Sequence, residues 1–261
     1  MDKILCCCYK RFTLRCNYGI YKFGYNIAAN KNKFGDNWRL ETGLSLTNHH
    51  SNLKIIDDKV DITENSAHFK IKLKKQFTTR LKISFGSGYF ITNFDESCTQ
   101  INSKKFNYGF SNNLFASFAE KNIFFSKNVA TKIGIRAEHY GLLNEFTISP
   151  RASLSYKSGK NSQFSLAYGQ FYQNPKNDYL KFSSDFKAEN TPHLIANFQH
   201  TKQNQIFRIE AYLKDYKDLV KYDTDFVGFN SNFSNTGKGF AKGIDVFWRQ
   251  NGQLKNTDYW I

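Results

Sequence analysis

The chain has only three prolines among its 261 residues, and no stretch rich in proline, glycine and serine divides it. It has no uninterrupted apolar run of about 20 residues, the length that a membrane-spanning helix needs. No segment shows sustained apolar residues at helical spacing either. These absences exclude a helical membrane protein and argue against two domains joined by a flexible linker.

Cysteine is nearly absent beyond the N-terminal end, where four of the five cysteines lie before Cys98. The first three are adjacent, which is not the spacing of a metal-ligand set, so we expect neither a metal nor another cofactor. Residues 4–9 form too short an apolar run for a signal peptide, and basic residues follow them. We therefore expect an atypical segment at residues 1–16 and one unit at residues 17–261.

The chain does contain a regular alternation of apolar and polar residues with a period of two. Residues 38–47 place Leu44 and Leu46 on one face of a strand and Arg39 and Glu41 on the other. Strong versions of this alternation recur at residues 67–74, 80–91, 129–138, 148–157 and 207–214. Weaker versions lie at residues 18–28, 105–119, 162–172, 194–201, 238–249 and 255–261. The sequence therefore predicts an all-β protein of about twelve strands.

The connections between these strands alternate in length. Short polar links are expected at residues 74–78, 157–161, 202–205 and 250–254, and long polar loops at residues 48–65, 93–104, 173–191 and 217–237. A sheet with one apolar face either buries that face in a core or turns it to lipid around a wet lumen. Alternating short and long links are typical of outer-membrane barrels, so we predict an antiparallel transmembrane β-barrel with strands of about ten residues.

Aromatic residues make up 17% of the chain and concentrate near the predicted strand ends. They include Phe124, Phe125, Tyr168, Phe171, Tyr172, Tyr212, Tyr216, Trp248, Tyr259 and Trp260. Aromatic girdles at the two membrane interfaces account for them, and the alternative is ordinary cross-strand packing. The net charge of +15 comes from lysines and arginines spread over most strands, so we expect a lumen wall and no nucleic-acid partner.

Five segments, in this order, carry a family resemblance. They are residues 149–156 (SPRASLSY), 168–175 (YGQFYQNP), 211–220 (AYLKDYKDLV), 235–249 (NTGKGFAKGIDVFWR) and 257–261 (TDYWI). Together they resemble the barrel of TonB-dependent outer-membrane receptors, particularly the group found in Bacteroidetes. The resemblance extends over residues 17–261 and is most specific from residue 149 onward.

The resemblance implies a barrel of about 22 strands filled by a plug, in the outer membrane of a Gram-negative cell. It also implies uptake of a siderophore, cobalamin, heme, glycan or peptide, driven through a TonB-type inner-membrane partner. From the sequence we expect the signal peptide, the TonB-binding box, the plug and the terminal strands of that family to be missing. We therefore expect a fragment of the barrel wall, surrounded by outer-membrane lipid, that does not transport by itself.

Two predicted loops contain candidate binding residues. Tyr179, Phe182 and Phe186 lie in the loop at residues 173–191 and are candidates for substrate contact, because exposed aromatic residues in a loop often serve binding. The alternative is that this loop folds over its own barrel rim. His49 and His50, with Asp57 and Asp58, offer metal-ligand chemistry. Adjacent histidines point in divergent directions on an extended backbone, so we expect no metal site there.

Two other readings remain open at this point. An outer-membrane barrel enzyme would use His139 beside Glu138, or His193, as a general base. No nucleophile lies at a matching spacing, so we expect no enzyme activity. The chain could also be a truncated, non-functional or purely structural barrel fragment. Its unpaired outer strands would then aggregate, and the isolated chain is expected to form inclusion bodies.

Overall fold

The computed structural model describes residues 16–55, 58–100, 105–225, 227–228, 230–254 and 257–260. Nearly all of them lie in one antiparallel sheet of fourteen strands. The strands are β1 (Cys16–Phe34), β2 (Trp38–Ile55), β3 (Asp58–Thr78), β4 (Leu81–Thr99), β5 (Lys105–Phe124), β6 (Val129–Tyr140), β7 (Glu145–Lys157), β8 (Ser162–Gly169), β9 (Tyr172–Gln173), β10 (Glu189–Asn190), β11 (His193–Lys202), β12 (Gln205–Tyr222), β13 (Phe233–Leu254) and β14 (Thr257–Trp260). One short helix, α1 (Asn177–Leu180), precedes β10. The prediction of about twelve strands is confirmed, since β9 and β10 have only two residues each.

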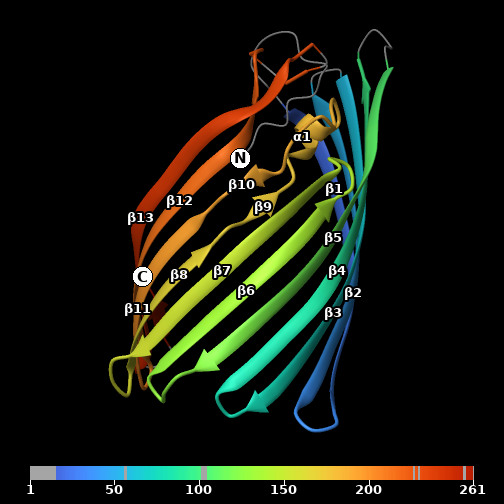
Figure 1. Ribbon diagram of the computed structural model, residues 1–261. Helices are drawn as coiled ribbons and strands as arrows, with labels where there is room; N and C mark the ends of the chain where they lie inside the picture. Colours follow the sequence, from blue (N-terminus) through green and yellow to red (C-terminus); the bar gives the residue numbers. More distant parts are fainter. Residues whose placement is uncertain are drawn as a thin grey trace.

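Each long strand pairs with its neighbours in chain order, and the sheet curls into a trough (Figure 1). The path runs from β1 to β8 and then through β11, β12, β13 and β14, while β10 pairs with β12 and β9 pairs with β10. Within the described residues β1 pairs only with β2, and β14 only with β13. The sheet is therefore an open, partial barrel with a concave inner face and a convex outer face.

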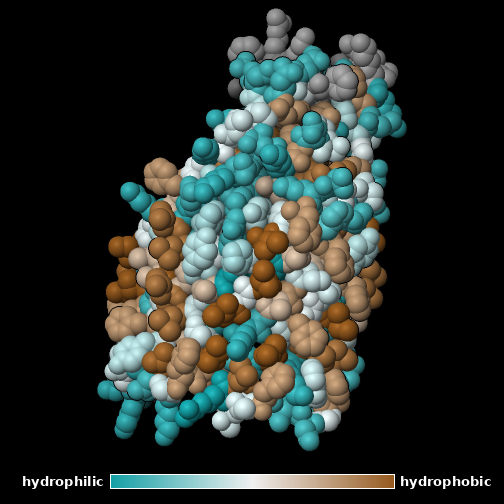
Figure 2. All heavy atoms as spheres, viewed as in Figure 1, coloured by the Kyte–Doolittle hydropathy of each residue, from teal (hydrophilic) through white to brown (hydrophobic). Residues whose placement is uncertain are grey.

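The convex face is apolar and uncovered. Leu44, Phe69, Tyr89 and Phe115 lie opposite one another across β2–β5, and each is 41–49% exposed. Figure 2 shows apolar side chains gathered over the middle and lower part of the strands, with hydrophilic side chains at both ends. A sandwich would bury this face against a second sheet. The outward apolar orientation predicted for a membrane barrel is therefore confirmed on these strands.

No helix in the described part of the chain has the length and hydropathy needed to cross a bilayer.

The strands are longer than predicted. The prediction of a loop at residues 48–65 is wrong. The β2–β3 hairpin continues to Ile55 and Asp58. Polar side chains hold it together above the apolar band, through hydrogen bonds from Asn48 to Asn65, between His50 and Thr63, and from Asn52 to Asp61. Backbone pairing does not require apolar side chains, so a polar stretch can remain a strand once it leaves the membrane. For the same reason β12 and β4 extend into the loops expected at residues 217–237 and 93–104.

Strand β1 departs from the predicted orientation. Tyr21, Phe23, Tyr25 and Ile27 are its apolar set, but they pair with the alternate residues 51, 49, 47 and 45 of β2, which line the concave face. They are 63–68% exposed there. The tight turn after Phe34 sets this register, with positive φ at Gly35 and Asn37. Because a one-residue slip in pairing reverses every side chain of a strand, turn geometry decides the face.

The aromatic residues expected in girdles divide between the two faces. Phe125 and Tyr168 are well exposed, and Tyr168 shares the outer face with Leu194. Phe171 instead contacts the ring of His193, and the Tyr212 hydroxyl reaches over Gly243, both on the concave face. Only part of the predicted set therefore lies on the face that a girdle requires, and the girdle stays a prediction.

Candidate functional site

The segment between β9 and β10 folds into the trough and is called here the inward loop (residues 174–188). It contains α1, and Figure 1 shows it near the upper end of the sheet. Leu180, Phe186 and Ala188 are only 2–6% exposed. The expected long connection at residues 173–191 is thus present, and much of it is buried.

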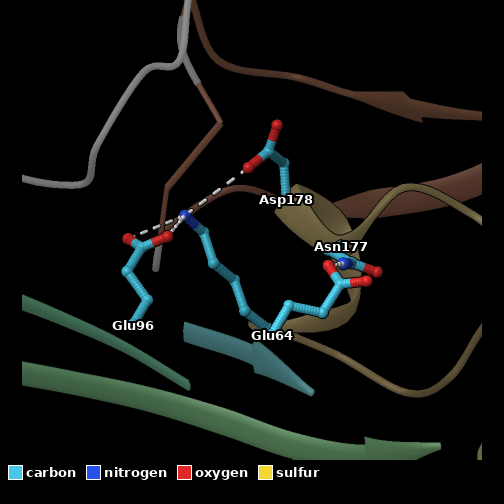
Figure 3. Close-up of polar contacts among 5 residues, drawn as sticks. Glu64, Glu96, Asn177 and Asp178 are labelled. Atoms are coloured by element: carbon cyan, nitrogen blue, oxygen red, sulfur yellow. Dashed lines mark hydrogen bonds and ion pairs between the residues drawn. The ribbon is translucent and has the colours of Figure 1, made fainter. Parts of the chain in front are cut away.

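A buried ion pair attaches the inward loop to β4. The Lys181 ammonium donates to both carboxylate oxygens of Glu96, at 2.9 and 2.8 Å. The two side chains are 0% and 1% exposed. Asp178 lies 3.7 Å from the same ammonium and is 45% exposed, so it adds less. Figure 3 shows Glu96 and Asp178 approaching one nitrogen from different elements.

A second polar contact attaches α1 to β3. The Asn177 side-chain amide donates to Glu64 at 3.0 Å, and Figure 3 shows the two side chains together. Glu64 lies directly across from Phe94 on β4, one row from Glu96. The inward loop is therefore attached at two neighbouring points on the same wall of the trough.

Aromatic rings attach the inward loop to the opposite side of the sheet. Phe233 of β13 lies within 5.5–6.4 Å, centroid to centroid, of the rings of Tyr179, Phe182 and Phe186. Phe182 also contacts Tyr108 of β5 edge to face at 5.1 Å. The rings therefore form one cluster that joins β5 to β13, the aromatic cluster. Such pairs each contribute roughly 0.5–1.5 kcal/mol beyond the area that they bury.

Carboxylates accept hydrogen bonds from backbone amides where the inward loop returns to the sheet. The Ala188 amide donates to Glu145 at 2.5 Å. Glu189 accepts from the Gln173 side chain at 2.9 Å and from the Val220 amide at 3.2 Å. With contacts to β3, β4, β5, β12 and β13, the inward loop crosses the upper end of the trough.

Burial in the aromatic cluster raises the pKa of Tyr179, and the neighbouring Tyr222 adds to this effect. Burial likewise raises the pKa of Tyr172 at the base of the inward loop. A raised phenol pKa keeps the hydroxyl protonated at and above neutral pH. Both hydroxyls therefore remain uncharged over a wider pH range than the hydroxyl of a free tyrosine.

Tyr179, Phe182 and Phe186, the residues predicted to contact substrate, share one ring partner. Phe186 is 6% exposed, while Tyr179 and Phe182 are partly accessible. These three side chains were predicted to be exposed. In the structure they pack against other aromatic rings inside the trough. Glu96 and Phe233 could not be identified from the sequence, because both lie in expected loops and a contact with a residue on another strand leaves no local pattern.

The other candidate residues are dispersed. The His50 ring lies 3.5 Å from Asp61, across the hairpin. No three metal-ligating side chains come together among the described residues, and Asp57 lies outside them. His139 pairs with Phe146 on the outer face, whereas Glu138 is buried on the inner face beside Arg136. Adjacent strand residues cannot act as a base and its orienting group, because they point to opposite faces.

Replacing Phe233 with alanine should loosen the inward loop by about 1–3 kcal/mol, because three ring contacts are lost. Protease cleavage within residues 174–188 of the detergent-solubilised chain measures this. Phe240→Ala is the matched control, since Phe240 lies on the same strand and is 70% exposed. Equal cleavage of the two variants would contradict a role for the aromatic cluster.

An open antiparallel trough with an apolar outer face and charged inner face defines an outer-membrane barrel wall. Comparison with protein families agrees: the model described as TonB dependent receptor-like, beta-barrel matches residues 10–260. The chain therefore belongs to the TonB-dependent receptor β-barrel family, whose members are outer-membrane proteins. A search of curated protein sequences finds no significant match.

Solved structures with the same fold include the siderophore receptor PirA from Acinetobacter baumannii, with a TM-score of 0.71 and 10% identity over 90% of this chain and 43% of that one. A mutant ferric enterobactin receptor, PfeA, from Pseudomonas aeruginosa in complex with enterobactin gives 0.70 and 13%, over 93% and 43%. The RagAB peptide importer gives 0.64 and 11%, over 93% and 36%. This chain thus spans less than half the length of these structures.

Proposed function

We propose that the chain forms part of the barrel wall, and one substrate-contacting loop, of an outer-membrane receptor for active uptake of a large substrate. The family match over residues 10–260 carries this proposal. The candidate substrate classes are siderophores, cobalamin, heme, glycans and peptides. The energy for uptake comes from a TonB-type inner-membrane partner. The five ordered segments named above favour the Bacteroidetes-type group. Transport by this chain alone is not expected.

The inward loop supports a role in substrate contact. Loops at one end of a rigid barrel are where binding residues concentrate, and this one reaches the trough interior. Tyr179 and Phe182 offer partly accessible rings beside a protonated phenol. Rings of this kind suit a large substrate with apolar or aromatic groups and a few hydrogen-bond acceptors.

Uptake by the full-length receptor that contains this chain tests the proposal. In a Gram-negative host lacking its own receptors, one of the five radiolabelled substrate classes should accumulate, and a proton ionophore or deletion of TonB should abolish accumulation. Phe182→Ala should lower uptake at limiting substrate by about tenfold, as expected for a lost ring contact. Phe240→Ala on the outer face should leave it unchanged.

Two results would overturn the proposal. One is accumulation that persists with the ionophore, which describes a passive channel. The other is correct outer-membrane insertion with no accumulation of any of the five classes.

A further inference from the structure

Four asparagines gather on the convex outer face of β1–β4, and this set is called the amide row. They are Asn26, Asn48, Asn65 and Asn93. Asn48, Asn65 and Asn93 lie directly across from one another on β2, β3 and β4, and Asn26 of β1 lies diagonally to Asn48. Each of the three is four positions from a residue of the outward apolar row that begins at Leu44, so all of them face the same side.

The amide row lies at the height where the apolar band ends. Asn48 is ten positions beyond Trp38, where β2 begins. A strand rises about 3.3 Å per residue and tilts by roughly 40° in a membrane barrel, which places Asn48 roughly 25 Å above the turn. This is about the height of the apolar band of such barrels. The next outward row is polar, with His50, Thr63 and Asp95. The amide row therefore lies beside the lipid headgroups.

The amide row borders a hollow of about 410 Å³ on this outer face. Small residues leave it open: Ala67 lies between Leu46 and Ile91, and a Cβ on Gly24 would meet no atom within 4 Å. Leu46 and Ile91 are 46% and 37% exposed and continue the apolar band up to the amides. The hollow therefore has an apolar lower side and an amide upper side.

The amides of this row have hydrogen-bonding capacity that the sheet does not use. Asn48 donates to Asn65, whereas the side chains of Asn26 and Asn93 make no hydrogen bond with other described residues. Each amide offers two N–H donors and a carbonyl acceptor. A sugar hydroxyl is likewise both donor and acceptor, so the amide row is chemically complementary to a sugar.

The charges on this face disfavour a phosphate headgroup. None of the residues that line the hollow is charged. Asp61 and Asp95 lie on the same face above it, against one lysine, Lys22 of β1. A bound phosphate is normally held by arginine or lysine donors, and carboxylates nearby repel it. An uncharged headgroup avoids this repulsion.

We propose that the hollow binds a membrane lipid with an uncharged sugar headgroup. The sugar hydroxyls bond to the amide row, and the acyl chains lie along Leu46, Ile91 and the apolar band below them. The outer face already contacts lipid, so the surrounding leaflet supplies the ligand. The inference goes beyond the proposed function, because the hollow lies on the opposite face of the sheet from the inward loop.

Native mass spectrometry of the full chain, refolded in the sugar-free detergent dodecylphosphocholine, tests this proposal. Digalactosyl diacylglycerol should bind with a Kd about tenfold below that of phosphatidylglycerol with the same acyl chains. Asn65→Leu combined with Asn93→Leu should raise the Kd for the sugar lipid about tenfold, because two amides are lost. The matched control, Asn32→Leu with Asn107→Leu, removes two outward asparagines that do not line the hollow and should change the Kd by less than about twofold.

A second variant fills the hollow and keeps every amide. Ala67→Phe should also raise the Kd for the sugar lipid about tenfold, and it decides the matter if the double variant loses heat-modifiable gel migration. Equal affinity for the two lipids, or equal weakening in the two double variants, would overturn the proposal. Equal affinity for the free headgroup disaccharide would also overturn it, since the apolar band would then add nothing. Failed uptake by the full-length receptor would leave this binding intact.

Discussion

Replacing Lys181 by methionine should release the inward loop from the trough. The change leaves the Glu96 carboxylate buried, at 1% side-chain exposure, without its cation. Breaking one partner of a buried ion pair costs about 3–5 kcal/mol. Amide hydrogen exchange over residues 174–188 of the detergent-solubilised chain should therefore accelerate by roughly two to three orders of magnitude, because opening of this segment becomes that much easier.

Two variants separate this effect from simple loss of charge. Lys217→Met removes an exposed lysine that pairs with Asp215 at 3.4 Å, with both side chains about half exposed, and should cost less than about 1 kcal/mol. Lys181→Met combined with Glu96→Met also removes the carboxylate that the single variant leaves without its cation. The double variant should therefore recover much of the protection against amide hydrogen exchange. If amide hydrogen exchange over residues 174–188 were no faster in Lys181→Met than in Lys217→Met, the ion pair would not hold the inward loop.

An arginine on the outer face should destabilise the inserted sheet far more than an arginine next to it on the inner face. Leu166 is the middle outward apolar residue of β8 and is 51% exposed. Leu166→Arg should cost about 2–4 kcal/mol in lipid, because the guanidinium would lie in hydrocarbon. Urea titration of the chain refolded into phospholipid vesicles, followed by heat-modifiable gel migration, measures this cost.

Ser165→Arg is the matched control. Ser165 pairs with Ser155 and Asn197 on the concave face, where water can solvate an arginine. We expect a change within about 0.5 kcal/mol for this substitution. Similar destabilisation by both variants would mean that the outer face of β8 does not contact lipid.

Alternation alone was enough to predict the class of fold. Leu44, Phe69, Tyr89 and Phe115 came from separate predicted strands, and the structure aligns them in one outward row. The prediction succeeded because the period of two is a property of the backbone and holds wherever a strand crosses lipid. It failed at residues 48–65, where the apolar signal stops but backbone pairing continues.

The candidate site was only partly predictable. Tyr179, Phe182 and Phe186 were identified from loop composition, but their shared partner Phe233 lies on a strand far along the chain. No feature of the sequence around Lys181 distinguishes it from other loop lysines, and its partner Glu96 lies 85 positions away in the chain. No local pattern links such residues, because contacts between an inward loop and a distant wall depend on how the whole sheet curves.

The amino-acid order alone thus specifies which residues form strands, which faces are apolar and how charge is distributed, since these properties are local and repeat every second residue. Folding in three dimensions chose the face on which the aromatic residues of β1 lie, drew the inward loop into the trough and placed Lys181 on Glu96. Those outcomes depend on turn register and on sheet curvature, which sum small contributions from many residues that are distant in the chain.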